Sequence, residues 1–235
     1  MTTTRSGGVS APPYDSFNLG DHVGDDPAAV AANRTRLATS IGLPDNRLVW
    51  MNQVHGDHVE VVCRTPDPGA GVFDSTDALV TDVDGVVLAV VTADCVPVLL
   101  ADAHAGVVAA VHAGRLGAAA GVVLRTLEAM VTLGANLEHV SAFLGPAVSG
   151  ANYEVPEAMA LEVEQRLPGS RVTTERGTAG LDLRAGLARQ LAEAGVSSID
   201  SDPRCTVADN ALFSYRRDGL TGRLASLVWM ESDPR

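Results

Sequence analysis

Three stretches of the chain place histidine or cysteine side chains where apolar strands are expected to end. These stretches are residues 52–56 with His55, residues 92–100 with Asp94 and Cys95, and residues 110–117 with His112. Side chains at strand ends can meet at one edge of a sheet, so a single rim could gather both imidazoles and the thiol. Two imidazoles and one thiolate are good zinc ligands, and three protein ligands leave one position open for water or substrate.

The spacing of these residues does not decide their role by itself. The gaps of 40 and 17 residues between His55, Cys95 and His112 are unlike the compact signature of a zinc finger. A buried cysteine is often an inert hydrophobe, and a histidine at a strand end can be a core residue bonded to a carbonyl. Asp94 favours a functional interpretation, because burying a carboxylate without a partner is costly. His58 is not expected to share a site with His55, because residues three apart on a strand point to opposite faces.

Arginines indicate a second kind of chemistry near the carboxyl end of the chain. Residues 213–223 contain Arg216, Arg217 and Arg223 around an Asp-Gly turn. Guanidinium groups bind phosphate or carboxylate in a bidentate manner. A solvated hairpin is the alternative interpretation of the same pattern.

The charge composition excludes several classes of function. All 17 positively charged residues among the 235 are arginines, so lysine Schiff bases, pyridoxal-phosphate linkage and a P-loop lysine are excluded. Any positive charge at an active site must therefore come from arginine, a helix N-terminus or a metal. The net charge of −12 argues against nucleic-acid binding, which needs a basic surface.

Cysteine usage and hydropathy favour a soluble cytoplasmic protein that does not bind membranes. Cys63, Cys95 and Cys205 cannot all pair, and no C-x-x-C motif is present, which fits a reducing compartment. The first residues lack the apolar core of a signal peptide. No apolar run approaches the roughly 18 residues of a membrane span. The sequence does not indicate an oligomeric state.

Helix and strand patterns alternate along the chain. Residues 28–40 are predicted to form a helix, because Asp26 is a good N-cap and Pro27 suits the first turn. Further helices are predicted at residues 118–133, 157–167 and 183–194, and strands at residues 47–53, 58–63, 78–81, 86–92, 97–101, 106–111, 139–144 and 223–230. Strands interspersed with helices and no clean linker indicate one α/β domain over residues 1–235, with a mixed β-sheet and flanking helices.

Short motifs in a fixed order cover nearly the whole chain. They are residues 8–10, 18–20, 53–56, 76–81, 93–97, 112–114, 145–146, 153–155, 205–206 and 214–219. In this order they make the sequence resemble the YfiH family, also called the laccase-domain or polyphenol-oxidase-like family, of the purine nucleoside phosphorylase type. The resemblance implies a fold similar to that of the cytotoxic necrotizing factor catalytic domain.

The resemblance also implies a site and an activity. The implied ligands of a catalytic zinc ion are His55, Cys95 and His112. The implied reactions are phosphorolysis of adenosine, inosine, guanosine and methylthioadenosine, and deamination of adenosine by water that the metal makes more acidic. The expected partners are thus a purine nucleoside and phosphate. Arg216 and Arg217 are expected to hold phosphate, and Asp94 to orient a ligand or relay a proton.

One position departs from the family pattern. The family usually continues His-Ala-Gly with Trp-Arg-Gly, whereas this chain has Arg115, Leu116 and Gly117 after Gly114. A shift of one residue at a helix start turns a side chain by about 100°, because a helix has 3.6 residues per turn. Arg115 is therefore expected to miss the contact that the family's arginine makes.

Three alternative functions stay open at this point. Family members are also described as copper polyphenol oxidases, although this chain has no H-x-H pair and no methionine near Cys95 for an axial copper ligand. A metal-free or metal-assisted hydrolase that edits peptidoglycan precursors would use Cys95 as nucleophile and His112 as base. In a structural zinc site, Cys205 would supply the fourth ligand.

Overall fold

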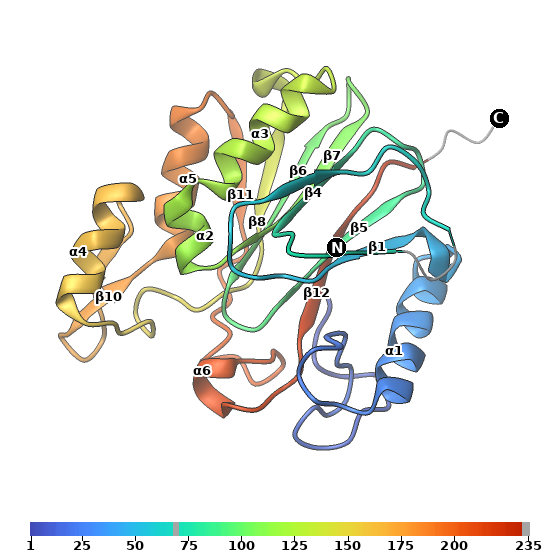
Figure 1. Cartoon of the computed structure of the whole chain (residues 1–235). Helices are drawn as coiled ribbons and strands as arrows, with labels where there is room; N and C mark the ends of the chain where they lie inside the picture. Colours follow the sequence, from blue (N-terminus) through green and yellow to red (C-terminus); the bar gives the residue numbers. More distant parts are fainter. Residues whose placement is uncertain (68–70, 232–235) are drawn as a thin grey trace.

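Two β-sheets face each other at the centre of the protein, and helices cover their outer faces (Figure 1). The computed structural model describes residues 1–67 and 71–231. No helix in these two ranges has the length and apolar character needed to cross a lipid bilayer. The arrangement is a mixed α/β fold, as the alternation of helix and strand patterns predicts.

The larger sheet has six strands within the described residues. Their order across the sheet is β11 (Ser198–Ser201), β8 (Ser141–Leu144), β6 (Val96–Asp102), β7 (Val107–Ala113), β4 (Ala78–Thr81) and β2 (Val59–Val61). The central pairs are antiparallel, whereas β11 and β2 run parallel to their neighbours. Helices α3 (Val122–Thr132) and α5 (Leu183–Glu193) share one apolar core with this sheet and cover its outer face.

The smaller sheet has four strands in the same part of the chain. Their order is β12 (Leu224–Val228), β5 (Val87–Thr92), β1 (Leu48–Met51) and β3 (Val72–Phe73). Helix α1 (Pro27–Ser40) covers its outer face, where Leu37 packs with Trp50. This helix begins as predicted, because Asp26 accepts a hydrogen bond of 2.9 Å from the N–H of Ala28 and Pro27 occupies the first turn.

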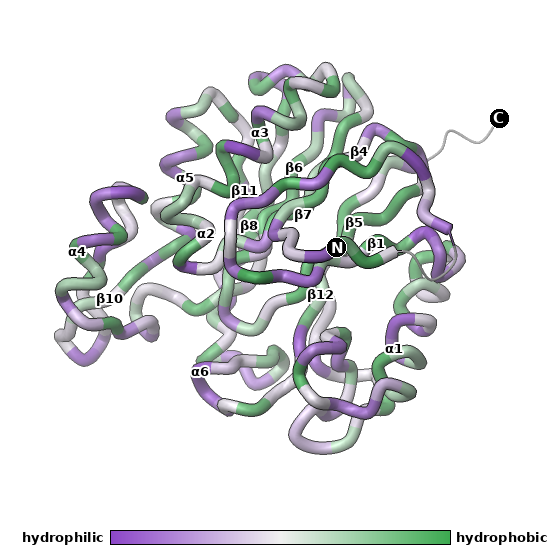
Figure 2. The backbone as a smooth tube through the Cα atoms, viewed as in Figure 1, coloured by the Kyte–Doolittle hydropathy of each residue, from purple (hydrophilic) through white to green (hydrophobic). Residues whose placement is uncertain are grey.

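Strand β5 explains why a continuous apolar run lies in this part of the sequence. Val87, Ala89 and Val91 point to the core beneath α1. Leu88 and Val90 point to the core between the two sheets. Both faces of the strand are therefore buried, so the usual alternation of apolar and polar residues disappears. Figure 2 shows that hydrophobic residues are concentrated in the central strands.

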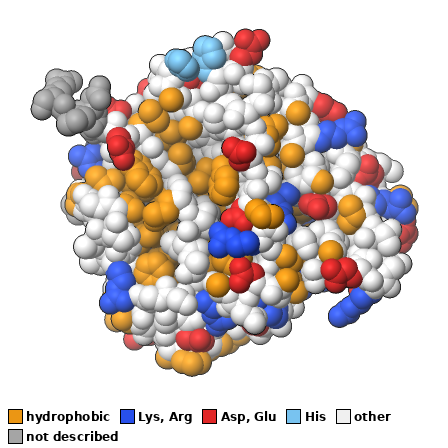
Figure 3. Space-filling view, turned by 180° about the vertical axis from the view of Figure 1, so that it is seen from behind, with side chains coloured by type: hydrophobic (Ala, Val, Ile, Leu, Met, Phe, Trp, Pro, Cys, Tyr) orange, Lys and Arg blue, Asp and Glu red, His pale blue; other side chains and the backbone are white. Residues whose placement is uncertain are grey.

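The remaining described elements are short helices, one small strand pair and two turns. They are α2 (Arg115–Ala120), α4 (Glu157–Arg166), α6 (Tyr215–Asp218), the antiparallel pair β9 (Arg171–Thr173) and β10 (Ala179–Leu181), and two 3₁₀ turns at Asp45–Arg47 and Leu137–His139. Seen from behind, charged side chains of both signs are scattered around an area where apolar side chains gather (Figure 3). The net negative charge thus forms no single acidic patch on that face.

Several boundaries differ from the sequence predictions for physical reasons. The helix predicted at residues 118–133 begins earlier, at Arg115, and is broken at Gly121, whose φ of +88° is left-handed. The strand predicted at residues 139–144 begins at Ser141, because a 3₁₀ turn precedes it. The short elements β3, β9, β10, β11 and α6 were not predicted, and the strands form facing sheets rather than one.

Helix α2 approaches the loop after β1 closely. A Cβ atom at Gly117 would overlap the carbonyl oxygen of Gly56. A Cβ at Gly114 would lie 2.8 Å from Cδ2 of His55 and 3.2 Å from Sγ of Cys95. Both glycines therefore permit the start of α2 to lie against residues that belong to the candidate site.

We predict that Gly117→Ala destabilises the protein. Alanine is normally better than glycine inside a helix by about 1 kcal/mol, so the sign of the effect tests the close approach. Urea unfolding followed by circular dichroism measures the change. Ala120→Gly in the same helix is the control and should cost about 1 kcal/mol or less through propensity alone. A Gly117→Ala protein that is more stable than the parent would contradict the packing described here.

Candidate metal centre and active site

His55, Cys95 and His112 come together at the end of the two sheets, although they lie on separate segments. His55 follows β1, Cys95 lies between β5 and β6, and His112 lies near the end of β7. Their ligand atoms all lie within 4.8 Å of one another. Nε2 of His55 is 3.8 Å from Sγ of Cys95, and the two imidazole rings meet edge to face with centroids 4.7 Å apart. The three side chains therefore share one rim, as the strand ends suggest.

The three donor atoms could hold a metal ion, and one separation is close to that of a tetrahedral site. In such a site a sulfur at about 2.3 Å and a nitrogen at about 2.0 Å from zinc are about 3.5 Å from each other. The 3.8 Å between Cys95 and His55 is close to this separation. Cys205 does not belong to this donor group, because its Sγ accepts a hydrogen bond of 3.3 Å from the N–H of Ser149. Among the described residues the group thus has three protein ligands and one open direction.

The buried carboxylate of Asp77 holds two of the three donors in place. Its Oδ1 lies 2.8 Å from Nδ1 of His112 and accepts a bond of 3.0 Å from the N–H of His55. Its Oδ2 accepts a bond of 2.7 Å from the N–H of Gly56. Since a carboxylate only accepts, Nδ1 of His112 carries the proton and Nε2 is left to act as a ligand or base.

Asp77 was not among the functional residues predicted from the sequence. In the sequence, Asp77 is visible only as an aspartate directly before an apolar strand. That pattern is equally typical of a turn. Burial raises the pKa of Asp77, but hydrogen bonds from His112 and from the N–H groups of Gly56 and Val54 outweigh it and lower the pKa below its ordinary value. The aspartate is therefore ionised when it holds the site.

Cys95 and His112 form an ion pair in the metal-free site. Burial would raise the pKa of the Cys95 thiol, but the charge and hydrogen bonds of His112 and His55 lower it to about 6. Burial likewise opposes the charged form of His112, yet the Cys95 thiolate and the Asp77 hydrogen bond raise its pKa to about 9. A thiolate is the form of cysteine that binds metals and acts as a nucleophile.

Asp94 points away from the metal donors and fixes a different segment. Its Oδ1 accepts bonds of 2.6 Å from the Thr206 hydroxyl and 2.7 Å from the Ser214 hydroxyl. Its Oδ2 accepts a bond of 2.6 Å from the N–H of Arg216. Its backbone has a φ of +95°, a left-handed conformation that is uncommon outside glycine. This network explains how the chain tolerates a carboxylate between two apolar strands.

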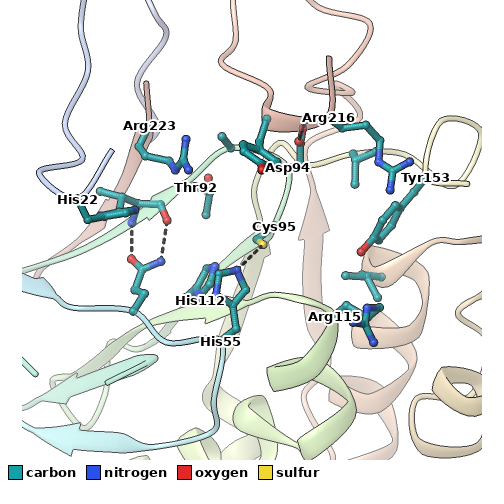
Figure 4. A pocket seen from close by; sticks show the side chains of 16 residues that line it. His22, His55, Thr92, Asp94, Cys95, His112, Arg115, Tyr153, Arg216 and Arg223 are labelled. Atoms are coloured by element: carbon teal, nitrogen blue, oxygen red, sulfur yellow. Dashed lines mark hydrogen bonds between the residues drawn. The ribbon is translucent and has the colours of Figure 1, made fainter. Parts of the chain in front are cut away.

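The donors open into a cavity of about 560 Å³ with an arginine-containing wall (Figure 4). Besides His55, Asp94, Cys95 and His112, the lining includes His22, Gln53, Thr92, Arg115, Tyr153, Tyr215, Arg216 and Arg223. Arg115 therefore reaches the cavity despite its shifted position in the sequence. Tyr153 lies in the motif of residues 153–155. It was not predicted to be a site residue, because its neighbours in the cavity come from distant segments.

Arg217 is not among the residues that line the cavity, in contrast to the expected phosphate-binding role. Its guanidinium donates hydrogen bonds to the carbonyls of Thr206, Asp209 and Leu212 and pairs with Asp218 at 2.8 Å. Its donors are thus used within the protein. The sequence placed Arg216 and Arg217 together, but the short helix α6 turns neighbouring side chains in different directions.

The low pKa of Cys95 gives a testable prediction for protein from which metal has been removed. Alkylation of Cys95 by iodoacetamide should rise with pH around a midpoint of about 6, because the thiolate is the reactive form. Mass spectrometry of the peptide containing Cys95 measures the rate. His112→Gln should move the midpoint upward, since it removes the stabilising positive charge. A midpoint of about 8.5 in the parent, the ordinary value for cysteine, would contradict this ion pair.

The whole chain is similar to proteins that carry functional names. It is 70% identical to a protein named purine nucleoside phosphorylase from Mycobacterium tuberculosis, over 98% of this chain and 91% of that protein. A Corynebacterium glutamicum protein of the same name is 59% identical, over 98% and 94% of the two chains. The crystal structure of YfiH from Bacillus licheniformis superposes with a TM-score of 0.90 at 30% identity, covering 98% and 91% of the chains. The chain belongs to the YfiH-like family described as multi-copper polyphenol oxidoreductase laccase, whose family model matches residues 1–231.

Proposed function

We propose that this protein is a zinc-dependent purine nucleoside phosphorylase that also deaminates adenosine. The observation that carries the proposal is the convergence of His55, Cys95 and His112 with arginines in one cavity. The names of the M. tuberculosis and C. glutamicum relatives support an enzyme of this class. The proposed substrates are adenosine, inosine, guanosine and methylthioadenosine, with inorganic phosphate as the second substrate of phosphorolysis, and the proposed compartment is the cytoplasm.

The proposed reactions place two demands on the site. In phosphorolysis a phosphate oxygen forms a bond to C1′ of the ribose, the C1′–N9 bond breaks, and the purine leaves with that electron pair and takes up a proton. In deamination, water adds at C6 of adenosine and ammonia leaves, which yields inosine. The first reaction needs an anion site near the sugar, and the second needs activated water near the base.

The residues of this chain divide these tasks. A bound zinc ion would supply a Lewis acid and lower the pKa of water toward about 7. Asp77 keeps Nε2 of His112 free to serve as a donor and fixes the His55 loop. Asp94 holds the segment with Arg216 at the cavity, which makes it a positioning residue. Zinc is preferred over copper because no methionine lines the cavity as an axial ligand among the described residues.

A second candidate function is favoured by one specific observation. Cys95, His112 and Asp77 are arranged as nucleophile, base and orienting carboxylate, which is the geometry of a cysteine hydrolase. Such an enzyme would act without a metal, and hydrolysis of peptidoglycan precursors is a candidate reaction. This function leaves the position of His55 beside Cys95 unexplained, so the metal-dependent phosphorylase remains our first proposal.

The first test measures product and metal together. Purified protein with adenosine and phosphate should form adenine and ribose 1-phosphate, and without phosphate it should form inosine. His55→Ala and Cys95→Ala should each abolish stoichiometric zinc and at least about 99% of both activities, because each removes a ligand. The exposed His58→Ala, three residues from His55, is the matched control and should keep metal and activity.

Two results would redirect the assignment. Absence of both adenine and inosine from the wild-type reaction would overturn the phosphorylase proposal. Hydrolysis of a peptidoglycan precursor that survives complete removal of metal, and is lost in Cys95→Ala, would favour the cysteine hydrolase.

A further prediction concerns the carboxylate behind the ligands. Asp77→Asn should weaken zinc binding by about 10- to 100-fold, because the amide cannot stabilise the proton on Nδ1 of His112 as a carboxylate does. Competition with a chromophoric chelator measures the affinity independently of turnover. Asp74→Asn, an exposed aspartate three residues earlier, is the control and should not change it. Equal zinc affinities in both variants and the parent would remove Asp77 from the proposed metal centre.

A further inference from the structure

Two arginines and a tyrosine from distant parts of the chain form one side of the cavity. Arg115 is the first residue of α2, Tyr153 lies between β8 and α4, and Arg216 belongs to α6. Figure 4 shows Tyr153 between the two arginines, on the opposite side of the metal donors from His22 and Arg223. The cavity therefore has two distinct sides with the metal donors between them.

Tyr153 brings the two arginines into one group. The guanidinium carbon of Arg216 lies 4.8 Å from the centroid of the Tyr153 ring, a cation–π contact. Burial and the Cys95 charge raise the pKa of the Tyr153 phenol, while the charges of both Arg115 and Arg216 act to lower it. Both cations therefore influence the same phenol, and Figure 4 shows Tyr153 between them.

Neither guanidinium forms an ion pair with a carboxylate of the described residues. Over residues 1–67 and 71–231, the ion pairs to carboxylates involve other arginines, including the neighbouring Arg217 with Asp218. Asp94 also lines the cavity, but the bond that its carboxylate accepts from Arg216 comes from the backbone N–H. Two guanidinium groups without such an ion pair in one cavity wall are typical of a site that binds an anionic ligand.

Arg223, on the other side, is less suited to this role. Its Nη1 donates to the carbonyls of Thr221 and Gly222, which uses part of its hydrogen-bonding capacity. Burial lowers the pKa of its guanidinium, although the negative charges of Cys95 and Asp94 act to raise it. The Arg115 and Arg216 pair therefore offers the stronger anion site of the two sides.

We propose that Arg115 and Arg216, positioned by Tyr153, form the subsite that binds inorganic phosphate. The proposal rests on the proposed phosphorylase function and specifies where its second substrate binds. It adds no chemical step: the bound phosphate presents an oxygen toward the region beside the metal donors, where the nucleoside sugar must lie. Arg115 and Arg216 contact the anion, whereas Tyr153 acts through them as a positioning residue.

The decisive experiment measures binding of inorganic phosphate directly and kinetically. Isothermal titration of metal-quantified protein with phosphate gives the affinity, and initial rates at varied phosphate or nucleoside give the two KM values. Arg115→Gln and Arg216→Gln should each weaken phosphate binding and raise the phosphate KM by about tenfold or more, since each removes charge-assisted hydrogen bonds. The phosphate KM should change by a larger factor than the nucleoside KM and the deamination rate, because the lost bonds are to phosphate and deamination does not use phosphate.

Two Tyr153 variants test whether this side chain positions the arginines, with a separate check that each variant is folded. Phenylalanine keeps a ring under Arg216 but loses the hydroxyl near Arg115, so phosphate affinity should fall by less than in either arginine variant. Tyr153→Leu removes the ring as well and should approach the effect of Arg216→Gln. Near-ultraviolet circular dichroism and bound zinc check that each variant is folded. Arg176→Gln, an exposed arginine outside the cavity, is the matched control and should behave as the parent.

The outcomes distinguish this subsite from the proposed function. If the parent cleaves nucleosides with phosphate but neither arginine variant changes phosphate affinity or KM, the function stands and the subsite is wrong. If phosphate binding depends on both arginines but no nucleoside is cleaved, the subsite stands and the phosphorylase function is wrong. Failure of the parent to show either a phosphate KM or phosphate binding at millimolar concentration overturns both.

Discussion

The organisation of the site depends on one buried interaction, the carboxylate of Asp77 against His112 and the loop that carries His55. A buried carboxylate is stable only when its oxygens are satisfied, and here the imidazole and three backbone N–H groups satisfy them. The same bonds that offset the cost of burial fix the position of His112 on β7 relative to the loop that carries His55. Stability of the loop and geometry of the site are therefore set by the same atoms.

Much of the fold follows from local patterns in the sequence. The cap formed by Asp26 and Pro27 predicts the start of α1, and the apolar run of β5 predicts a strand buried on both faces. The break at Gly121 was missed because helical periodicity continues across it, whereas the left-handed backbone there is visible only in the structure. The short edge strands were missed because their pairing depends on neighbours far along the chain.

The candidate site could be predicted only in part, for a related reason. Histidine and cysteine at strand ends are visible in a sequence because these residue types are rare and chemically distinctive. Asp77 and Tyr153 are ordinary residue types whose importance comes from what tertiary structure places beside them. Arg216 and Arg217 show the reverse, because two residues that look equivalent in the sequence differ in the structure. Arg216 lines the cavity, whereas Arg217 donates to backbone carbonyls.

The network around Asp94 has a consequence for biosynthesis. Its three hydrogen-bond donors come from Thr206, Ser214 and Arg216, more than one hundred residues further along the chain. During translation the strands that carry Cys95 and His112 are complete long before these partners have been made. His55, Cys95 and His112 are therefore translated while the wall with Arg216 is still absent. The candidate donor group is thus translated early, whereas the wall that contains Arg115 and Arg216 is complete only in the nearly finished chain.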